Sequence, residues 1–291
     1  IMKPPYPSLT PTWHNDVYPA IEYSNPNVSH EGHTIIITGA GGGIGRETAI
    51  GYATARAKHL VLVGLTKSKL EETAAQASKA NPYAKISIFD ADVTDEAAMA
   101  KVAGEVGTWD AVVFCAGWMP TPSPVAKSDI SDFWKSYEVN VKAIAVMVKA
   151  FLPTASPTYA AFLAMISAGS VFPAQMLVGY AGYQVAKVAA AKMIEILAEE
   201  NPNVFFAAVH PGMVETDGFR KSGYTTDMLA MDDVKLPAGF SLWASLPEAK
   251  FLTGRFIWAN WDIEELKGMR EEIVSGTKLL FGYNSWPFPN M

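Results

Sequence analysis

The chain has 291 residues, is 49% hydrophobic and carries a formal net charge of −6 at pH 7. A chain of this length and composition can bury the core of one large domain, or of two smaller ones at most. Its acidic balance provides no basic field for phosphate backbones or anionic lipid, so we expect no nucleic-acid or membrane partner and favour a small molecule.

Cysteine and histidine usage bears on the cellular compartment and on metal binding. The single cysteine, Cys115, lies in an apolar run and cannot form an internal disulfide, which favours a reducing compartment, with the cytoplasm as the expected location. The first twenty residues are too rich in proline and polar residues for a signal peptide, and no apolar run reaches membrane-spanning length. His30 and His33 lack further ligands at metal-site spacing, so we expect no metal.

In chain order, residues 1–32 predict an extended arm laid over the surface of a domain at 33–260. The domain begins with "HTIIITGAGGGIGRE", whose pattern indicates a strand, a tight glycine turn and a helix. Short, continuous apolar runs then recur, as is typical of strands buried on both faces of a parallel sheet. These runs are "LVLVGL", "KISIFDADV", "DAVVFCAG", "AAFLAMIS" and "NVFFAAVHPG", with "GRFIWAN" as a seventh strand.

Helical segments separate the runs, at about Lys67–Lys79, Asp95–Glu105, Asp129–Leu152 and Gly182–Glu200. This alternation predicts an α/β fold: a single Rossmann-like, doubly wound parallel sheet of about seven strands, with helices on both faces. Ligands of such sheets bind beyond the carboxyl ends of the strands. The irregular stretch at 213–246 is a candidate substrate lid, and 261–291 is expected to form a C-terminal helix and a docked aromatic tail.

The glycine turn does not fit the GxGxxG fingerprint, but Gly39, Gly43 and Gly45 fit TGxxxGIG, with Gly42 and Ile44 between them. The first glycine permits the turn, the second lets backbone approach a pyrophosphate, and the third lets the helix start close to the sheet. A glycine-rich loop can also be a mere connection. Because this one follows the first strand of an α/β series, dinucleotide binding is favoured.

Two residues that close the third strand support this interpretation. In "DADV", the Asp92 carboxylate can accept from an adenine amino group, and Val93 can lie against the ring. Taken alone, Asp92 is more typical of a helix N-cap than of an adenine contact.

Tyr183 and Lys187 stand four residues apart in "YQVAK", so a helix places the ammonium beside the phenol. Of the eleven tyrosines, only Tyr183 has a lysine at this spacing. For an isolated pair the alternative is a snorkelling lysine beside a half-buried tyrosine. If the pair takes part in catalysis, the lysine cation should favour the phenolate form and lower the pKa of the tyrosine.

Together with the glycine turn, "CAG" after the fourth strand, a serine after the fifth, "YQVAK" and "HPGMVET", the sequence resembles the short-chain dehydrogenase/reductase family from about Gly32 to Leu252. The resemblance implies NAD(P)-dependent oxidoreductase activity. It implies a catalytic set of Asn140, Ser167, Tyr183 and Lys187. It also implies cofactor contacts by the glycine turn, by Tyr183 and Lys187, by the backbone of Ala116 and Gly117, and by Pro211, Gly212, Val214 and Thr216, which hold the nicotinamide carboxamide in the family.

The chemistry agrees with these roles. For reduction, Ser167 would hydrogen-bond the carbonyl oxygen, hydride would come from the nicotinamide, and Tyr183 would protonate the developing alkoxide. Asn140 would hold a water that returns the proton to Lys187. The alternatives are that Ser167 caps a turn and that Asn140 faces solvent. Phe114 and Cys115 depart from the family, which commonly has two asparagines there.

Cofactor choice is set just after the second strand. Neither an aspartate nor an arginine stands there, and Leu65 is followed by Thr66, with Lys67 and Lys69 beyond. Without a carboxylate to exclude a 2′-phosphate, the sequence favours NADP(H) over NAD(H). The expected pocket residues are apolar and aromatic, which suits a bulky, uncharged ketone or secondary alcohol. They are Trp118, Met119, Pro120, Phe172, Met176, Leu177, Tyr180, Phe219 and Tyr224.

The flanking stretches "WHNDVYPA" and "RFIWANWDIEEL" are similar to those of fungal short-chain reductases, some of which serve secondary metabolism. A rival hypothesis is a redox-silent member that uses its pocket for cyclisation or isomerisation, or as a cofactor-bound binding module. The complete set of four residues favours an oxidoreductase. Two helical stretches, "VAKVAAAKMIEILA" and "VNVKAIAVMVKAFL", are apolar over more than one face, so we expect a homodimer or homotetramer.

Overall fold

A computed structural model describes residue 5 and residues 8–282. Within this range, seven parallel strands form one sheet in the order β3-β2-β1-β4-β5-β6-β7, which confirms the expected Rossmann-like, doubly wound fold. The strands are β1 (Thr34–Thr38), β2 (His59–Gly64), β3 (Lys85–Asp90), β4 (Ala111–Phe114), β5 (Ala160–Met165), β6 (Val204–His210) and β7 (Phe256–Trp258).

The strand order reverses beside β1, whose residue Ile36 pairs with Val61 of β2 on one side and with Val112 of β4 on the other. All three side chains are fully buried, as expected for strands covered on both faces. Crossovers leave this point in opposite directions, so the carboxyl ends of β1 and β4 open a crevice there. The glycine turn follows β1 directly and therefore lies at the crevice.

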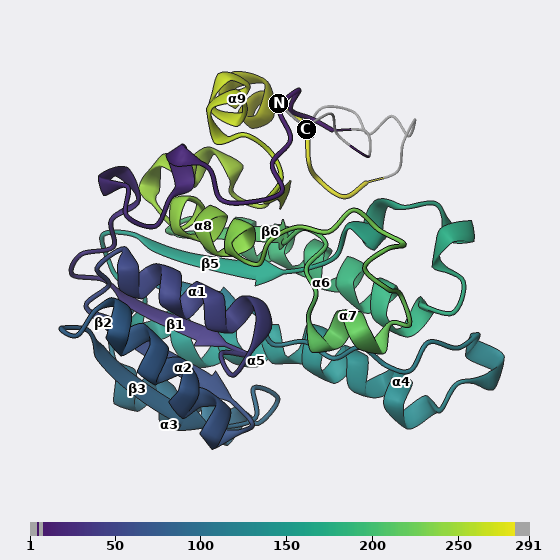
Figure 1. Ribbon diagram of the computed structural model, residues 1–291, viewed down its shortest axis with the longest axis horizontal. Coiled ribbons are helices and arrows are strands. Elements are labelled where there is room, and N and C mark those ends of the chain that lie inside the picture. The colour runs from purple at the N-terminus through teal and green to yellow at the C-terminus, as the bar shows by residue number, and fades with distance from the viewer. Residues whose placement is uncertain (1–4, 6–7, 283–291) are drawn as a thin grey trace.

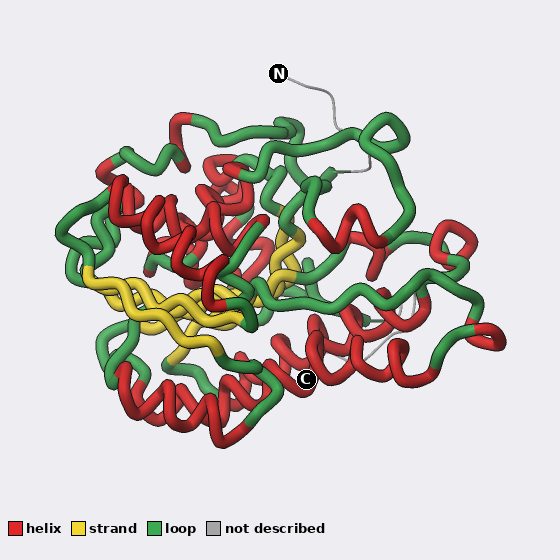
Figure 2. Tube along the Cα trace, turned by 60° about the horizontal axis from the view of Figure 1, so that its bottom comes forward, coloured by secondary structure: helices red, strands yellow, loops and turns green. Residues whose placement is uncertain are grey.

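Two helical layers cover the sheet, as Figure 2 shows. The layer toward the viewer in Figure 1 contains α1 (Gly43–Thr54), α2 (Lys67–Ala80) and α8 (Lys235–Ala244), with α1 packed against the other two. The opposite layer contains α3 (Glu96–Val106), α5 (Ala143–Phe151) and α6 (Ala181–Glu200). The segments that follow the carboxyl ends of the strands, α4 (Ile130–Tyr137) and α7 (Asp217–Lys221) among them, lie on the right in Figure 1.

The single helix expected at Asp129–Leu152 is interrupted. It consists of α4, a π-helical stretch at Glu138–Lys142, and α5. Asn140 lies in the π-helical stretch and is fully buried. A buried amide needs hydrogen-bond partners, and a local change of helical pitch turns its side chain toward them.

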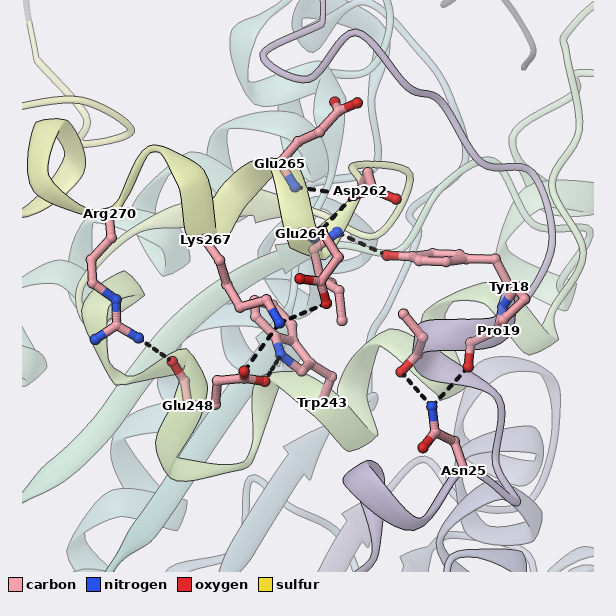
Figure 3. Close-up of polar contacts among 12 residues, drawn as sticks. Tyr18, Pro19, Asn25, Trp243, Glu248, Asp262, Glu264, Glu265, Lys267 and Arg270 are labelled. Carbon is pink, nitrogen blue, oxygen red and sulfur yellow. Dashed lines mark hydrogen bonds and ion pairs between the residues drawn. The ribbon is translucent and has the colours of Figure 1, made fainter.

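The N-terminal segment is closely attached to the domain. Its described part includes two 3₁₀ turns, Pro19–Ile21 and Pro26–Val28. Ile21 is fully buried, and Tyr18 Oη accepts a hydrogen bond of 3.0 Å from Ile263 N at the start of α9 (Ile263–Gly268). Figure 3 shows Tyr18 reaching this helix and Asn25 turning back to Pro19. The N-terminal segment thus lies against α9, near the C-terminal end of the described chain.

The C-terminal segment is held by its own polar contacts. The Glu248 carboxylate accepts hydrogen bonds from Trp243 Nε1 and Lys267 Nζ, and its carbonyl accepts from Arg270 in α10 (Arg270–Ser275) (Figure 3). Phe281 stacks on Phe256 of β7 at 5.4 Å between ring centroids. The expected docking of the aromatic tail falls, beyond residue 282, outside the described residues. Along the described chain, no helix is long and apolar enough to cross a membrane.

The expected lid at 213–246 divides into two parts with different environments. Its first part, including α7, lies beside the carboxyl ends of the strands, whereas every residue from Leu236 to Ala244 in α8 is buried. The expectation of a lid running to 246 was therefore wrong over α8. This helix packs along α1, and a Cβ added to its Gly239 would lie 2.6 Å from Ile21 O, so α8 belongs to the core.

Candidate active site

A cavity of about 220 Å³ lies beyond the ends of β5 and β6. Its wall is largely apolar and aromatic and comes from segments far apart in the sequence. Seven of the nine expected pocket residues contribute to it: Met119, Phe172, Met176, Leu177, Tyr180, Phe219 and Tyr224. Ser167 and Tyr183 line the same cavity, together with other polar side chains such as Tyr180, Thr216 and His210.

Trp118 and Pro120 are not part of this wall, contrary to expectation. The Trp118 indole donates to Asp132 Oδ1 at 2.8 Å, and its ring lies 4.0 Å from Lys135 Nζ and 4.2 Å from Lys221 Nζ. These polar groups hold the ring outside the cavity by a hydrogen bond and two cation–π contacts. Pro120 is buried against the start of α6.

The glycine turn is tightly packed at two of its glycines. Gly39 has a φ of +63°, and an added Cβ would lie 2.9 Å from Ala116 N. A Cβ on Gly45 would lie 2.4 Å from Gly39 O, which is closer than real side chains approach. Gly42 precedes α1 without any side-chain cap, and Ile44 reaches the cavity wall. The first amides of α1 are thus left for an anionic ligand.

The region expected to select the cofactor lies beside this turn. Leu65 is exposed, and Thr66 precedes α2 without a side-chain capping bond. A Cβ added to Gly41 would lie 3.1 Å from Lys69 Cβ, and Lys69 Nζ is 3.9 Å from Asp217 of α7. Lys69 therefore extends across the glycine turn.

Arg46, to which the sequence assigned no role, braces the same turn. It donates to Gly41 O at 2.7 Å and to Thr73 Oγ1 at 3.1 Å. Its position directly after the third glycine of the motif was the available signal. The guanidinium fixes the turn to α2, as its fixed fork of donors permits.

Asp92 does not cap a helix, because the N-cap of α3 is Asp95. Asp92 Oδ1 accepts from Thr94 N and Thr94 Oγ1, and the carboxylate is exposed. The neighbouring Val93 is mostly buried. The adenine contacts expected of Asp92 and Val93 remain predictions.

Ser167 follows β5 and combines two properties that were alternatives in the sequence. Its Oγ accepts from Gly169 N at 3.2 Å and so caps the 3₁₀ turn Ala168–Val171, and the residue also lines the cavity. Capping a turn and facing a ligand are compatible, because a hydroxyl group has two lone pairs as well as one hydrogen.

Tyr183 and Lys187 lie together on α6, but the pKa of Tyr183 is not lowered as the sequence predicted. Lys187 Nζ lies 5.6 Å from the centre of the Tyr183 ring and donates to Met165 O at 2.8 Å. Burial raises the pKa of Tyr183 to about 12 and lowers that of Lys187 to about 8. The expected lowering of the tyrosine pKa was wrong for the protein alone, since desolvation disfavours both charged forms.

Asn140 is fully buried, which excludes the alternative that it faces solvent. Its Nδ2 donates to Trp118 O at 2.8 Å and to Ser136 Oγ at 2.9 Å, and its Oδ1 accepts from Trp118 N at 3.2 Å. A Cβ added to Gly117 would lie 3.2 Å from Asn140 Oδ1 and 3.7 Å from Lys187 Nζ. The structure thus brings Asn140 and Lys187 together at Gly117. Ala116, one residue earlier, donates its N–H to Thr38 Oγ1.

The loop after β6 contributes Pro211, Gly212, Val214 and Thr216 to the cavity wall. Gly212 has a φ of +85°, and the next amide, Met213 N, donates to Asp232 Oδ2 at 2.6 Å. Thr216 caps α7, and a Cβ added to Gly43 would lie 3.1 Å from its Cγ2. This loop therefore closes over the start of α1.

His210 is a cavity residue that the sequence interpretation missed, although "HPG" was noted. It is buried, its Nδ1 accepts from Ala168 N at 3.1 Å, and burial lowers its pKa to about 3. The imidazole is therefore neutral at physiological pH. Further unpredicted wall residues are Gln184, Met213, Ser222 and Leu229.

These features fit a nicotinamide dinucleotide. A glycine turn with no room for a side chain at Gly39 and Gly45, followed by an uncapped helix start, suits a pyrophosphate. Both features adjoin the cavity that Ser167, Tyr183 and Thr216 line. The residues that would hold the dinucleotide are the glycine turn at one end and the Pro211–Thr216 loop at the other.

Comparisons with known proteins agree with this fit. The family model for short chain dehydrogenases matches residues 33–226. Short chain dehydrogenase/reductase AacuD of Aspergillus aculeatus is 29% identical over 273 residues, which cover 93% of this chain and 94% of the relative. Short chain dehydrogenase mpl6 of Monascus purpureus is 31% identical over 286 residues, covering 94% and 97%.

Among solved structures, the NADP complex of a Shigella flexneri 2a protein described as a short chain dehydrogenase superposes with a TM-score of 0.71. The match covers 80% of this chain and 99% of the other, at 21% identity. At that identity the likeness establishes the fold alone.

Proposed function

Because the chain belongs to the short-chain dehydrogenase/reductase family and is thus an NAD(P)-dependent oxidoreductase, we propose that it interconverts a bulky hydrophobic ketone and the corresponding secondary alcohol. Tyr183 is the proposed general acid in reduction and general base in oxidation. The observation that carries the proposal is that Tyr183 and Ser167 line one apolar cavity, with the buried Lys187 one helical turn away.

The Ser167 hydroxyl would donate to the carbonyl oxygen of the ketone and hold it near Tyr183. With its pKa raised to about 12, the Tyr183 phenol is protonated at neutral pH and is ready to donate a proton to the developing alkoxide. When bound, the nicotinamide would supply hydride in the reducing direction and accept it in the oxidising one. The apolar wall keeps bulk water away from the reacting carbonyl.

The proton given up by Tyr183 must be replaced. Lys187, whose ammonium is anchored on Met165 O, is placed to return it. Asn140 would hold the water that connects Lys187 to solvent, and its contacts with Trp118 and Ser136 fix its side chain for that role. The positioning of both residues beside Gly117 supports this relay.

The size and lining of the cavity support the substrate class. Among the described residues no lysine or arginine lines it, so a sugar phosphate or a small acid would lose solvation without gaining a charged partner. The similarity to fungal proteins supports a terpenoid-like or polyketide-like ketone of secondary metabolism. The absence of a carboxylate after β2 and the position of Lys69 across the glycine turn support NADP(H) over NAD(H). The single cysteine supports the cytoplasm as the location.

The direct test is oxidation of NADPH and NADH, followed by absorbance, with a panel of hydrophobic ketones. Tyr183→Phe should lower kcat at least about 1,000-fold, because the proton donor is lost while the ring is kept. The matched control is Tyr180→Phe, which removes a cavity hydroxyl that donates to Ser222 O. That change should alter kcat less than about fivefold. Equal losses in the two variants, or turnover that survives Tyr183→Phe, would contradict the assignment.

A further inference from the structure

A second, much smaller cavity of about 10 Å³ adjoins the main one. The two share Ala168, Phe172, His210 and Met213 as lining residues. Its other walls come from the N-terminal segment, from the region of Asp232 and from the end of β7; besides Pro5 and Ala230 they consist of polar and aromatic residues. We call it the polar annex; its distinguishing residues are Trp13, Asn15, His210, Asp232 and Asn260.

Asp232 sets the orientation of both amides in the annex. Its Oδ1 accepts from Asn15 Nδ2 at 2.7 Å and from Asn260 Nδ2 at 3.0 Å, while its Oδ2 accepts from Met213 N. Because each Nδ2 must face the carboxylate, each amide oxygen is directed elsewhere. Both oxygens, Asn15 Oδ1 and Asn260 Oδ1, are buried and have no hydrogen-bond partner among the residues that the structure describes.

The annex also contains unpaired donors. The Trp13 indole is buried, and its Nε1–H has no partner within the described part of the chain. Since His210 Nδ1 accepts from Ala168 N, the neutral ring carries its hydrogen on Nε2. The lining residues thus carry two unpaired acceptors and, in the Trp13 indole, one unpaired donor among the described residues, and His210 adds a second N–H group at the boundary with the main cavity.

Unpaired buried polar atoms are costly, so this arrangement suits a ligand group that completes their hydrogen bonds. A space of about 10 Å³ accommodates a single oxygen atom. A hydroxyl can donate its one hydrogen to one of the two amide oxygens and accept from the Trp13 indole, whereas a carbonyl oxygen could pair with neither amide oxygen. A carboxylate would be repelled by Asp232.

We propose that the annex receives a hydroxyl group of the substrate, remote from the carbonyl that is reduced. The inference rests on the proposed function and narrows its substrate class: a mainly hydrophobic ketone with one distal hydroxyl. The N-terminal segment, through Trp13 and Asn15, then takes part in substrate selection.

The test compares 4-phenylcyclohexanone with its ortho-, meta- and para-hydroxyphenyl analogues as substrates, with NADPH and NADH. The informative variant is Trp13→Phe, which removes one unpaired donor of the annex and keeps an aromatic ring. The matched control is Trp261→Phe. Trp261 is equally buried and its Nε1 is also unpaired among the described residues, but it does not line the annex.

We expect kcat/KM for at least one hydroxylated analogue to exceed that for the parent ketone about tenfold in the unmodified protein, the contribution of a good buried hydrogen bond. Trp13→Phe should reduce this ratio to about three or less, and Trp261→Phe should leave it within twofold. The same ratio in all three proteins, or no preference for any hydroxylated analogue, would overturn the inference while leaving the proposed function intact. Failure to reduce any ketone with either cofactor would instead contradict the proposed function.

Discussion

At the residue scale, the central feature is a pair of titratable groups held in a desolvated place. Lys187 is 4% exposed, and its only hydrogen bond to the described residues is the one to Met165 O. A buried ammonium without a counter-charge costs folding free energy, which is why its pKa is lowered from 10.5 to about 8. The chain thus keeps a destabilising group where the proposed proton relay needs it.

This cost predicts that Lys187→Met stabilises the protein at neutral pH while it abolishes activity. A pKa lowered to this extent corresponds to about 3 kcal/mol, from which about 1–3 kcal/mol is lost by leaving Met165 O unpaired. The sign follows from proton binding. The penalty is complete below pH 8, where the folded protein carries the charge, and vanishes as the pH rises past 10.5.

Thermal unfolding from pH 6 to pH 10.5 measures this difference. We expect Lys187→Met to unfold a few degrees above the unmodified protein at pH 7 and to lose its advantage at pH 10 and above. Lys192→Met, on the exposed side of the same helix, is the control and should show no such pH-dependent gain. An advantage that grows with pH would have the wrong sign.

At the scale of single elements, the hypothesis of cofactor binding depends on how the start of α1 packs against the glycine turn. Gly45 is the residue through which the helix rests on the turn, since an added Cβ would lie 2.4 Å from Gly39 O. The contact is with backbone, so no side chain can move aside. Any substitution must shift the helix away from the turn and from the phosphates that it is proposed to bind.

Gly45→Ala should therefore destabilise the fold by about 2–4 kcal/mol and weaken the binding of NADP⁺ at least about 30-fold. Gly104→Ala is a matched change in another helix, α3, where an added Cβ would meet nothing within 4 Å. That control should gain about 0.5–1 kcal/mol from the better helix former. Calorimetry with NADP⁺ and chemical denaturation measure the two effects. Unchanged cofactor affinity in Gly45→Ala would exclude the turn as the phosphate site.

At the scale of the whole molecule, α6 presents apolar side chains on two sides. Its inner residues pack on the sheet, while Val185 and Ile196 remain 51% and 49% exposed. These two are eleven residues apart, about three helical turns, and lie on one face. An exposed apolar face of this kind is typical of a surface covered by another copy, so we propose a homodimer or homotetramer built on α6.

Replacing both residues, Val185→Lys with Ile196→Lys, should convert the assembly to monomers, because charged side chains cannot be buried against their own copies. Sedimentation velocity measures the mass. Tyr83→Lys, a change at a 96% exposed aromatic in the loop between α2 and β3, should leave the assembly unchanged. An unmodified protein that sediments as a monomer would refute the proposal.

Sequence periodicity was sufficient for the fold because strands buried on both faces appear in the sequence as continuous apolar runs. The expectation of burial on both faces was wrong for β3, an edge strand that has no buried residue. The runs that became β1 to β7 needed only length and spacing to be recognised, and the helix predicted at about Asp95–Glu105 agrees with α3, which the structure shows to be capped by Asp95. The helix around Asn140 was misjudged, since a π-helical stretch of five residues is too short to alter visibly the apolar periodicity of the helices on either side. The role of α8 was also missed, because its burial depends on α1 and on the N-terminal segment rather than on its own pattern.

The amino-acid sequence by itself determined the family, the parallel sheet and the identity of the proposed catalytic residues, because these depend on local residue types and their spacing. Only the tertiary structure decided what surrounds them. It turned Trp118 out of the cavity, brought His210 and Asp232 to its edge, and made burial rather than a neighbouring charge the dominant influence on Tyr183. Desolvation and hydrogen-bond pairing are set by groups far apart in the chain. Contacts between such groups produce no local pattern in the sequence from which they could be predicted.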